Sequence, residues 1–468
     1  MRKIRIRGRI PGTPFSLVVP VLAGLAACSS PLGEPTVTMD PTMVTRAFVH
    51  VDSETPVTAH VEYGDKDADT DTWLTTPSVT GTSLDFVLYL HADTTSQFRI
   101  KGEDERGRPV STRKQEITTE GLPSDIPEFS PMIDVALDGL SPWLLTSLLG
   151  GELSASVVTI VTLDGRVVWY WQPEDTVIPS ARLDAASGLI YGTGFDIANE
   201  GHAYMFTLPL AGTGGEAGEV VKHDLQWAHH DAIMLDERET ESSPGTIVVP
   251  VSTFADVDGV TVAGDSIVEI SPDGTETTIW DAFDHLVPAE NASWNMTQFP
   301  QGQKDWTHGN GLFYDDTDGA YYFSLWGPEQ IVKIDRSTGN TVWHMGGPEN
   351  EFDFGDDPGF GPQHAPEFSN GELRLFDNRN SSSGSRGASY AVDEDARTAT
   401  LTWSFEPADA QWALVLGDVT LRPDGSHLLS WGSSGDIFMT DAQDELVGFI
   451  RCDEPLAIGQ VSELAELP

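Results

Sequence analysis

Three histidines of this chain, His230, His308 and His364, occupy the same place in three similar stretches of sequence. Each precedes a short apolar strand, a turn that contains Gly with Asp or Asn, and a second apolar strand. Near neutral pH an imidazole can act as a nucleophile, an acid, a base or a metal ligand. In a closed repeat architecture, equivalent positions lie on one ring about the symmetry axis, even when they are far apart in the sequence. We therefore expect a histidine cluster at the mouth of a central channel.

Two further residues belong to this ring hypothesis as candidate ligand contacts. A sixth repeat places Asp418 at the equivalent position, within LGDVTLRPDGSHLLS. His229 competes with His230 for the first position. His230 is favoured because the dipeptide HD at 230–231 corresponds in form to the dipeptide HA at 364–365. An isolated histidine is more often a structural hydrogen-bonding residue, whereas three in register among six repeats favour a functional site.

The elements that must position these residues come from a second recurring motif, which begins near residue 138. It consists of a strand, a turn such as D-x-x-G, and a strand that usually ends in Trp. The copies are VTIVTLDGRVVWYW, IVEISPDGTETTIW, IVKIDRSTGNTVWHM, SYAVDEDARTATLTWSF and IFMTDAQDELVGFI, and a degenerate copy, YMFTLPLAGTGGEAGEVVKHD, follows the first. Repeats built only from strands at this spacing are typical of four-stranded propeller blades. We therefore predict an all-β fold with a six-bladed β-propeller over residues 138–468, in which the Trp side chains pack the outer hairpins.

A smaller domain precedes the propeller. Residues 34–121 contain short alternating strands separated by turn residues, as in TAHVEYGD, SLDFVLYL and TSQFRIKGEDERGR. This spacing predicts a small β-sandwich, and the pattern resembles fibronectin type III-like domains. We expect it to act in spacing or packing. Residues 122–137, which are rich in Pro and acidic residues, would form the linker.

The first residues are expected to be a targeting segment and not part of the fold. The basic stretch MRKIRIRGR precedes the apolar run FSLVVPVLAGLA, and LAAC ends the segment at Cys28. The run is too short to span a bilayer, and the pattern resembles a bacterial lipobox. We expect residues 1–27 to be a signal peptide and Cys28 to carry a lipid anchor in the membrane; the alternative is plain cleavage that leaves Cys28 as an ordinary thiol. Ser29 favours sorting of this exported lipoprotein to the outer membrane, on its periplasmic or cell-surface face.

The chain is strongly acidic, with 73 Asp and Glu against 26 Lys and Arg and a net charge of −47 at pH 7. This charge excludes ordinary nucleic-acid binding, which requires a basic surface. It also repels an anionic ligand unless a local cation attracts it. Histidines in this negative field are expected to hold protons more tightly than free imidazole and so to supply that cation. Cys452, the one cysteine besides Cys28, is expected to be a buried thiol.

Four segments carry a resemblance to a known family: HHD at 229–231, DWTHGN at 305–310, QH at 363–364 followed by NGELRLFDN, and GDVTLRPDG at 417–425. Together with an exported six-bladed propeller behind an N-terminal β-sandwich, they resemble the bacterial arylsulfate sulfotransferase family over essentially the whole mature chain. The resemblance implies transfer of a sulfuryl group from an aryl sulfate ester to a phenol, with no cofactor and no nucleotide sulfate donor. The absence of a Gly-rich phosphate loop from the sequence agrees with this.

The resemblance also implies roles for individual residues. His364 matches the nucleophile of the family, which forms a sulfohistidine intermediate. His230 and His308 would bind the oxygens of the transferring sulfuryl group, and one of them would protonate the departing phenolate. Asn310, two residues after His308, would donate a hydrogen bond to the same oxygens.

One departure from the family pattern concerns charge. The family has an arginine on the strand after THGN, where it neutralises the sulfate, whereas the matching residue here is Trp326. No Arg or Lys occurs between Lys304 and Lys333. Loss of a fixed cation at this place would remove about 2–4 kcal/mol of transition-state stabilisation. Arg379, beyond the inner strand of the next repeat, could replace it, and Trp326 could stack on an aromatic ring of the substrate.

Two other functions stay open at this point. Three imidazoles on one ring could hold a metal such as zinc, with Asp418 or Asp231 as a further ligand or as the partner of a ligand, and activate water for hydrolysis. The chain could instead be a non-catalytic surface protein whose altered pocket captures an aromatic or anionic ligand, a reading that Trp326 favours. The transferase itself is expected to use no metal. The sequence is compatible with a homodimer.

Overall fold

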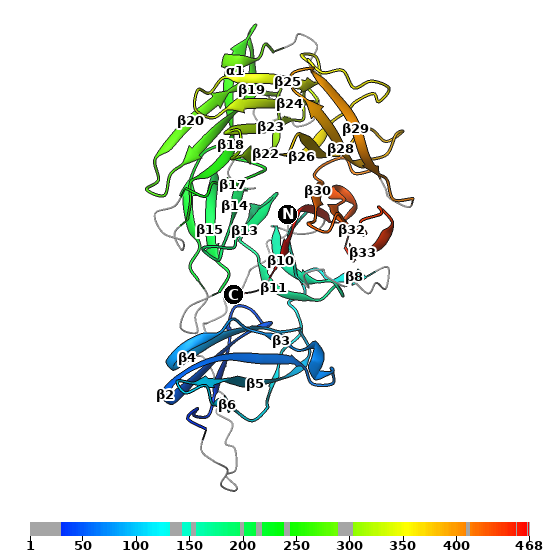
Figure 1. Cartoon of the computed structure of the whole chain (residues 1–468). Coiled ribbons are helices and arrows are strands. Elements are labelled where there is room, and N and C mark those ends of the chain that lie inside the picture. Colours follow the sequence, from blue (N-terminus) through cyan, green and yellow to red (C-terminus); the bar gives the residue numbers. More distant parts are fainter. Residues whose placement is uncertain are drawn as a thin grey trace, which may run out of the picture. The chain divides into compact units, whose positions relative to one another are not determined.

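The computed structural model describes residues 30–131, 143–150, 156–196, 201–211, 218–237, 244–288, 303–408, 412–454, 456–465 and 467. The expected signal peptide and Cys28 lie outside these residues. The described chain is built almost entirely from β-strands and divides after Gly121 into two compact units (Figure 1).

The N-terminal unit is one seven-stranded sheet that curls into a half-barrel. Its elements are β1 (Thr36–Met39), β2 (Arg46–Asp65), the 3-10 turn η1 (Thr70–Thr72), β3 (Leu74–Thr75), β4 (Val79–Tyr89), β5 (Thr95–Asp104), β6 (Pro109–Ser111) and β7 (Gln115–Thr118). The long strand β2 pairs with β1, β3, β4 and β5, and a register shift between Asp52 and Val57 lets it change partners along its length. Buried apolar side chains, among them Val49, Leu84 and Phe98, fill the inside of the curl. The expected fibronectin type III-like sandwich thus takes the form of one continuous sheet.

The second unit is a six-bladed β-propeller, as predicted. Each blade is a sheet of four or five strands. The predicted copies of the Trp-ending motif form the two outer strands of the first five blades, and β32 and β33 of the sixth, where β8 is added outside them. The blades consist of β9 (Trp143–Leu149), β10 (Val157–Thr162), β11 (Val167–Trp171) and β34 (Ala457–Leu464); β12 (Thr176–Val177), β13 (Ala181–Asp184), β14 (Leu189–Asp196), β15 (Ala203–Pro209) and β16 (Val221–Asp224); β17 (Ile233–Met234), β18 (Ile247–Val257), β19 (Val260–Ile270), β20 (Glu276–Asp281) and β21 (Lys304–Asp305); β22 (Gly309–Asp315), β23 (Ala320–Leu325), β24 (Gln330–Asp335) and β25 (Thr341–Gly346); β26 (Gln363–Ser369), β27 (Glu372–Asp377), β28 (Arg386–Asp393) and β29 (Thr398–Phe405); and β30 (Asp418–Leu421), β31 (His427–Ser430), β32 (Asp436–Thr440), β33 (Leu446–Cys452) and β8 (Phe129–Pro131).

The inner strands form a closed ring in the order β34, β13, β17, β22, β26 and β30. Strand contacts join five of the six successive pairs, and Arg182 of β13 binds Asp231, two residues before β17, at the sixth. The ring closes because β34, from the C-terminal end of the sequence, pairs antiparallel with β9 and completes the first blade. This closure brings the start of each inner strand to the same end of the channel.

Large aromatic side chains pack the blades, as expected from the repeated Trp. Trp169, Trp280 and Trp343 are each at most 2% exposed. Burial of such side chains provides much of the packing energy of a fold that lacks disulfides. Cys452, in β33, is unpaired and buried, as predicted.

Two other segments complete the described fold. Residues 129–131, in the expected linker, form β8, which pairs with β33 as a fifth strand of the sixth blade. The helical pieces are α1 (Ala282–His285) and the 3-10 turn η2 (Gly432–Ser434). In the part of the chain that the structure describes, no helix is long and apolar enough to cross a membrane.

Closure of the ring depends on a glycine in β34. A Cβ atom at Gly459 would overlap the carbonyl oxygen of Pro179 and the hydroxyl of Ser147, whereas Gly121 has no heavy atom within 4 Å of that position. We expect Gly459→Ala to lower the free energy of unfolding by about 1–3 kcal/mol, as overpacking does. Urea unfolding checks this, with Gly121→Ala as the control. Equal stability of the two variants would contradict the close approach of β34 to the neighbouring blade.

Candidate active site

All six blades contribute to one cavity on the propeller axis. The cavity measures about 260 Å³, including the part that is open to solvent, and lies where the inner strands begin. Its lining residues are Pro179, Ser180, His230, Asp231, Asn310, His364, Ala365, Leu416, Gly417 and Gln460. Residues from distant parts of the sequence can therefore act on one small ligand.

The three histidines singled out from the sequence come together here. His230 and His364 both line the cavity. The ring of His308 lies 4.7 Å from that of His230, centroid to centroid, in an edge-to-face arrangement. The clustering predicted from repeat phase is what the structure contains.

The backbone at the cavity adopts an uncommon conformation in four consecutive blades. His230, His308, Ala365 and Leu416 have φ values of 56°, 48°, 46° and 60°. Left-handed conformations are unfavourable for residues other than glycine, and they gather at sites where a side chain or an amide must be held in place. The repeat of this feature from blade to blade indicates a ring of turns shaped for a ligand.

The tautomer of His364 is set by Asn378. Nδ1 of His364 lies 2.7 Å from Oδ1 of Asn378. The Asn378 amide nitrogen donates to the carbonyl oxygens of Ala413 and Leu416, both at 2.9 Å, so its oxygen must face His364. Nδ1 of His364 is therefore the donor, and Nε2 keeps a lone pair, which accepts a hydrogen bond from the Leu416 N–H at 3.2 Å.

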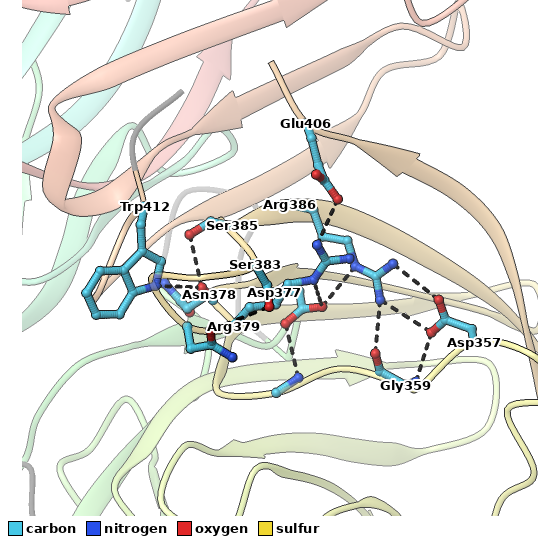
Figure 2. A network of polar contacts seen from close by, with 12 residues as sticks. Asp357, Gly359, Asp377, Asn378, Arg379, Ser383, Ser385, Arg386, Glu406 and Trp412 are labelled. Atoms are coloured by element: carbon cyan, nitrogen blue, oxygen red, sulfur yellow. Dashed lines mark hydrogen bonds and ion pairs between the residues drawn. The ribbon is translucent and has the colours of Figure 1, made fainter. Parts of the chain in front are cut away.

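Figure 2 shows the network that holds Asn378 in place. Its carbonyl oxygen accepts hydrogen bonds from Ser385 Oγ at 3.0 Å and Trp412 Nε1 at 2.9 Å. The preceding Asp377 binds Nε of Arg386 at 2.9 Å. Since Asn378 is anchored through its backbone and its amide, it orients His364 from a rigid support.

Burial makes His364 a weakly basic imidazole. The pKa of His364 is lowered to about 3. Burial is the main cause, the charge of His308 adds to it, and the hydrogen bond to Asn378 offsets part of the effect. His364 is therefore uncharged at neutral pH.

His308 is held in the opposite state by Asp305. Nδ1 of His308 lies 2.6 Å from Oδ2 of Asp305. Burial lowers the pKa of His308, but the hydrogen bond and charge of Asp305, together with the charge of Asp265, outweigh burial and raise it above the usual value. Within the cluster, His308 is therefore the imidazole whose surroundings stabilise the positively charged form.

Burial lowers the pKa of His230 well below the usual value, and a positive charge on the neighbouring His308, His229 or His364 lowers it further. The expectation that the acidic chain would make its histidines hold protons more tightly is therefore correct for His308 and wrong for His230 and His364. Desolvation within the cavity outweighs negative charge that is spread over the protein surface.

Two residues expected to contact the ligand are close to the histidines. Asn310 lines the cavity, donates from its amide nitrogen to the Gln363 carbonyl oxygen at 2.7 Å and accepts from Ser324 at 2.7 Å. The Trp326 ring lies 5.9 Å from that of His308 in an edge-to-face arrangement. Asn310 is therefore placed to act on a ligand in the cavity, whereas Trp326 contacts His308 but is not among the lining residues.

Three other expected ligand contacts have protein partners of their own. His229 bridges His230 and Asp265, with 2.8 Å between nitrogens on one side and 2.8 Å to the carboxylate on the other. Arg379 binds Glu406 at 2.8 Å and Asp377 at 3.3 Å, and it is not among the residues that line the cavity. Asp418 begins β30, where burial raises its pKa to about 6 although the charge of Arg182 opposes this.

Arg182 is a channel cation that the sequence analysis did not identify. It lies in β13 and binds Asp231, a cavity residue, at 3.2 Å. Asp231 also accepts a hydrogen bond from Gln460 of β34 at 3.2 Å. The signal was present, because ARLDAASGLIY has the strand–turn–strand form of the histidine repeats, but it lies in the blade whose outer motif is degenerate.

No group of three or more His, Cys, Asp or Glu side chains suited to hold a metal ion occurs among the described residues. Both nitrogens of His229 and both of His364 already have hydrogen-bond partners. The arrangement gives no support to the metal-dependent alternative.

Residues 152–453 match the model of the arylsulfotransferase (ASST) family. Because the match spans more than half of the chain, the chain belongs to this family, and membership indicates aryl-sulfate sulfotransferase activity. None of the curated proteins matches.

Similar solved structures include a protein of unknown function from Bacteroides caccae, with a TM-score of 0.42, 12% identity, and coverage of 69% of this chain and 100% of that chain. The periplasmic gluconolactonase of Pseudomonas aeruginosa has a TM-score of 0.39 and 10% identity, over 69% of this chain and 100% of that one. A putative 6-phosphogluconolactonase of Bacteroides fragilis NCTC 9343 has a TM-score of 0.35 and 12% identity, over 88% of this chain and 99% of that one. Similarity at these values carries no argument about function.

The role of Asn378 can be tested by a substitution that introduces a negative charge at this position. We expect Asn378→Asp to raise the pKa of His364 from about 3 toward neutrality, because a carboxylate beside Nδ1 favours the imidazolium. In the parent protein, unfolding lets His364 bind a proton below its ordinary pKa, so stability falls as the pH drops from about 6.5 to about 3. The variant should lose this part of the acid destabilisation.

Titration of the His364 ring by NMR and urea unfolding across that pH range give the two measurements. Asn370→Asp, in the exposed turn between β26 and β27, is the matched control. An unchanged His364 titration in Asn378→Asp would show that Asn378 does not determine the state of this ring.

Proposed function

We propose that this chain transfers a sulfuryl group from an aryl sulfate ester to a phenol, without a nucleotide donor, through a sulfohistidine formed at Nε2 of His364. Membership of the arylsulfotransferase family supports the two substrates. The observation that carries the proposal is the state of His364, an uncharged ring with Nδ1 bound to Asn378 and a lone pair on Nε2 at the axial cavity.

The reaction would proceed in two displacements at sulfur. In the first, Nε2 of His364 attacks the sulfur, the N–S bond forms, and the S–O bond to the aryl group breaks, so that phenolate departs with the electron pair. The Leu416 N–H, which donates to Nε2 in the free protein, then becomes available to a sulfuryl oxygen. In the second, the acceptor oxygen attacks the same sulfur and releases His364. An uncharged imidazole of low basicity suits both steps, since it attacks and leaves without a change of its own protonation.

Positive charge at the sulfuryl oxygens would come from His308 in place of the family arginine. The 2.6 Å contact with Asp305 favours the imidazolium, and the edge-to-face contact with His230 places it inside the cluster. Asn310 would contribute the amide hydrogen that it does not use for Gln363. Trp326, beside His308, would bind the aromatic ring of a substrate. A loose sulfuryl transition state needs chiefly such positioning and charge, by analogy with phosphoryl transfer.

We also propose that the protein works outside the cytoplasm as a lipoprotein. The basic start, the short apolar run and LAAC support cleavage before Cys28 and a lipid anchor on that cysteine. Ser29 supports attachment to the outer membrane. The N-terminal unit, residues 34–121, would then be the segment between the anchor and the propeller.

Replacement of the nucleophile tests the proposal directly. With 4-nitrophenyl sulfate as donor, we expect the parent protein to release 4-nitrophenolate and to carry a sulfuryl adduct on the His364 peptide, seen by mass spectrometry. His364→Asn should abolish both, because the variant lacks the imidazole nitrogen that forms the N–S bond. His202→Asn, in a half-buried histidine that does not line the cavity, is the control.

Two results would point elsewhere. Transfer that persists in His364→Asn would refute the nucleophile. Binding of aryl sulfate by the parent protein without any release of phenolate would favour the non-catalytic alternative.

The cation proposed at His308 predicts a change in pH dependence. Since Asp305 raises the pKa of His308, the charged form is lost only as the pH rises through that raised value. Asp305→Asn should move the alkaline limb of kcat/KM to lower pH and reduce the rate near neutrality about tenfold or more, up to the roughly 10²- to 10³-fold loss caused by removal of one oxyanion donor. Asp273→Asn, in an exposed turn, should leave the profile unchanged. An unshifted alkaline limb in Asp305→Asn would remove His308 as the source of charge.

A further inference from the structure

We infer that Asp265, His229 and His230 form a hydrogen-bonded relay that makes Nε2 of His230 the base that removes the proton of the acceptor phenol. The inference rests on the proposed function and assigns it one more step. His230 touches the substrate in this scheme, whereas His229 and Asp265 are positioning residues that act through it.

The relay begins at the carboxylate of Asp265, which can accept hydrogen bonds but cannot donate them. Asp265 is 2% exposed, and its Oδ2 accepts hydrogen bonds from Thr307 Oγ1 and from the Gly309 N–H, both at 2.6 Å. Its Oδ1 accepts from Ser252 at 3.1 Å and lies 2.8 Å from Nε2 of His229. Burial raises the pKa of Asp265, but the charge and hydrogen bond of His229 and the other donors lower it to about 2. An ionised carboxylate has no proton to give, so Nε2 of His229 must carry one.

The tautomer of His229 then determines that of His230. With its proton on Nε2, a neutral His229 accepts at Nδ1, which lies 2.8 Å from Nδ1 of His230. His230 must therefore donate from Nδ1, and the lone pair of the neutral ring stays on Nε2. Among the described residues Nε2 of His230 has no hydrogen-bond partner, and His230 lines the cavity. The free lone pair is thus available to a ligand.

The local backbone brings these two adjacent rings together. Neighbouring side chains usually point apart, but His230 has a φ of 56° and the Asp231 N–H donates to the His229 carbonyl oxygen at 2.9 Å. This three-residue turn leaves the two rings in an edge-to-face contact, 5.0 Å between centroids. Strain of this kind persists only where the surroundings enforce it.

The proton balance of the transfer requires such a group. In the second displacement the acceptor O–H bond breaks as the O–S bond forms, and the proton passes to Nε2 of His230. The positive charge on the ring is then stabilised through Nδ1–H, His229 and the carboxylate of Asp265, as in other carboxylate–histidine arrangements. Because the buried ring has a low proton affinity, it then releases this proton to solvent, and the phenolate that departs in the first displacement takes one from solvent, so that one donor and one acceptor exchange a sulfuryl group and a proton with nothing left over.

Other charged groups around His230 do not replace the relay. His308 and His364 lower the proton affinity of His230, and so does His229 when it is charged. The next residue, Asp231, is bound by Arg182 and Gln460. The ring is therefore an uncharged base between turnovers, and its path for sharing an acquired charge leads through His229.

Separate measurement of the two displacements tests the inference. His229→Gln keeps an amide that can donate to Asp265 and accept from Nδ1 of His230, but an amide, unlike an imidazole, cannot take up a share of the positive charge. In the full mature protein without acceptor, we expect it to give the same burst of 4-nitrophenolate from 4-nitrophenyl sulfate as the parent, because that leaving group needs no proton. Transfer to phenol, which must lose its proton, should fall about 10²-fold, the scale of general base catalysis. Transfer to pentafluorophenol, already ionised at neutral pH, should change less than about threefold.

The matched control is His223→Gln, since His223 also lies 2.8 Å from a carboxylate, that of Glu276, on outer strands of the propeller. It should behave like the parent with both acceptors. Equal loss for phenol and pentafluorophenol in His229→Gln, or no loss for either, would overturn the relay. Absence of a burst in the parent protein would instead refute the proposed function.

A second measurement does not depend on a variant. In the 15N spectrum of the histidine-labelled parent protein at neutral pH, His229 should carry its proton on Nε2 and His230 on Nδ1. A neutral His230 with its proton on Nε2 would overturn the inference even if His229→Gln failed to fold.

Discussion

The pairing of β34 with β9 is the constraint on which the rest of the propeller depends. It closes the ring of inner strands, and only a closed ring brings the starts of all six to one place. The closing strand also contributes to the cavity itself, because Gln460 lines it and binds Asp231 from the third blade. The strand that closes the propeller therefore also completes the cavity.

Within that ring, three chemically identical side chains are given three different partners. His364 faces an amide, His308 a carboxylate, and His230 another imidazole. Burial lowers the proton affinity of all three, and the partner decides how far that effect is offset. A site with one uncharged nucleophile, one cation and one base can thus be built from a single residue type, without a metal ligand set among the described residues.

The sequence allowed the blades and the histidine cluster to be predicted because both follow from repetition. The Trp-ending motif marks the outer strands, and equal repeat phase places His230, His308 and His364 on one ring. Pairings that cross between blades carry no such signal: Asp265 of β19 binds Thr307 and Gly309 at the start of the next blade, and Asn378 is oriented by carbonyl groups at residues 413 and 416. The proton affinities of His230 and His364 were predicted wrongly, since a charge of −47 for the whole chain says little about a buried ring.

The left-handed turns at His230, His308, Ala365 and Leu416 have a consequence for how transfer would take place. Rings and amides fixed by such turns have little freedom to follow a reacting group, so the dipoles need almost no reorganisation during the reaction. The motion must then belong to the sulfur atom, which travels from one oxygen to a stationary nitrogen and on to another oxygen. Under the proposed mechanism the substrates would approach the protein groups in turn, and turnover would be governed by how fast they exchange at the mouth of the channel.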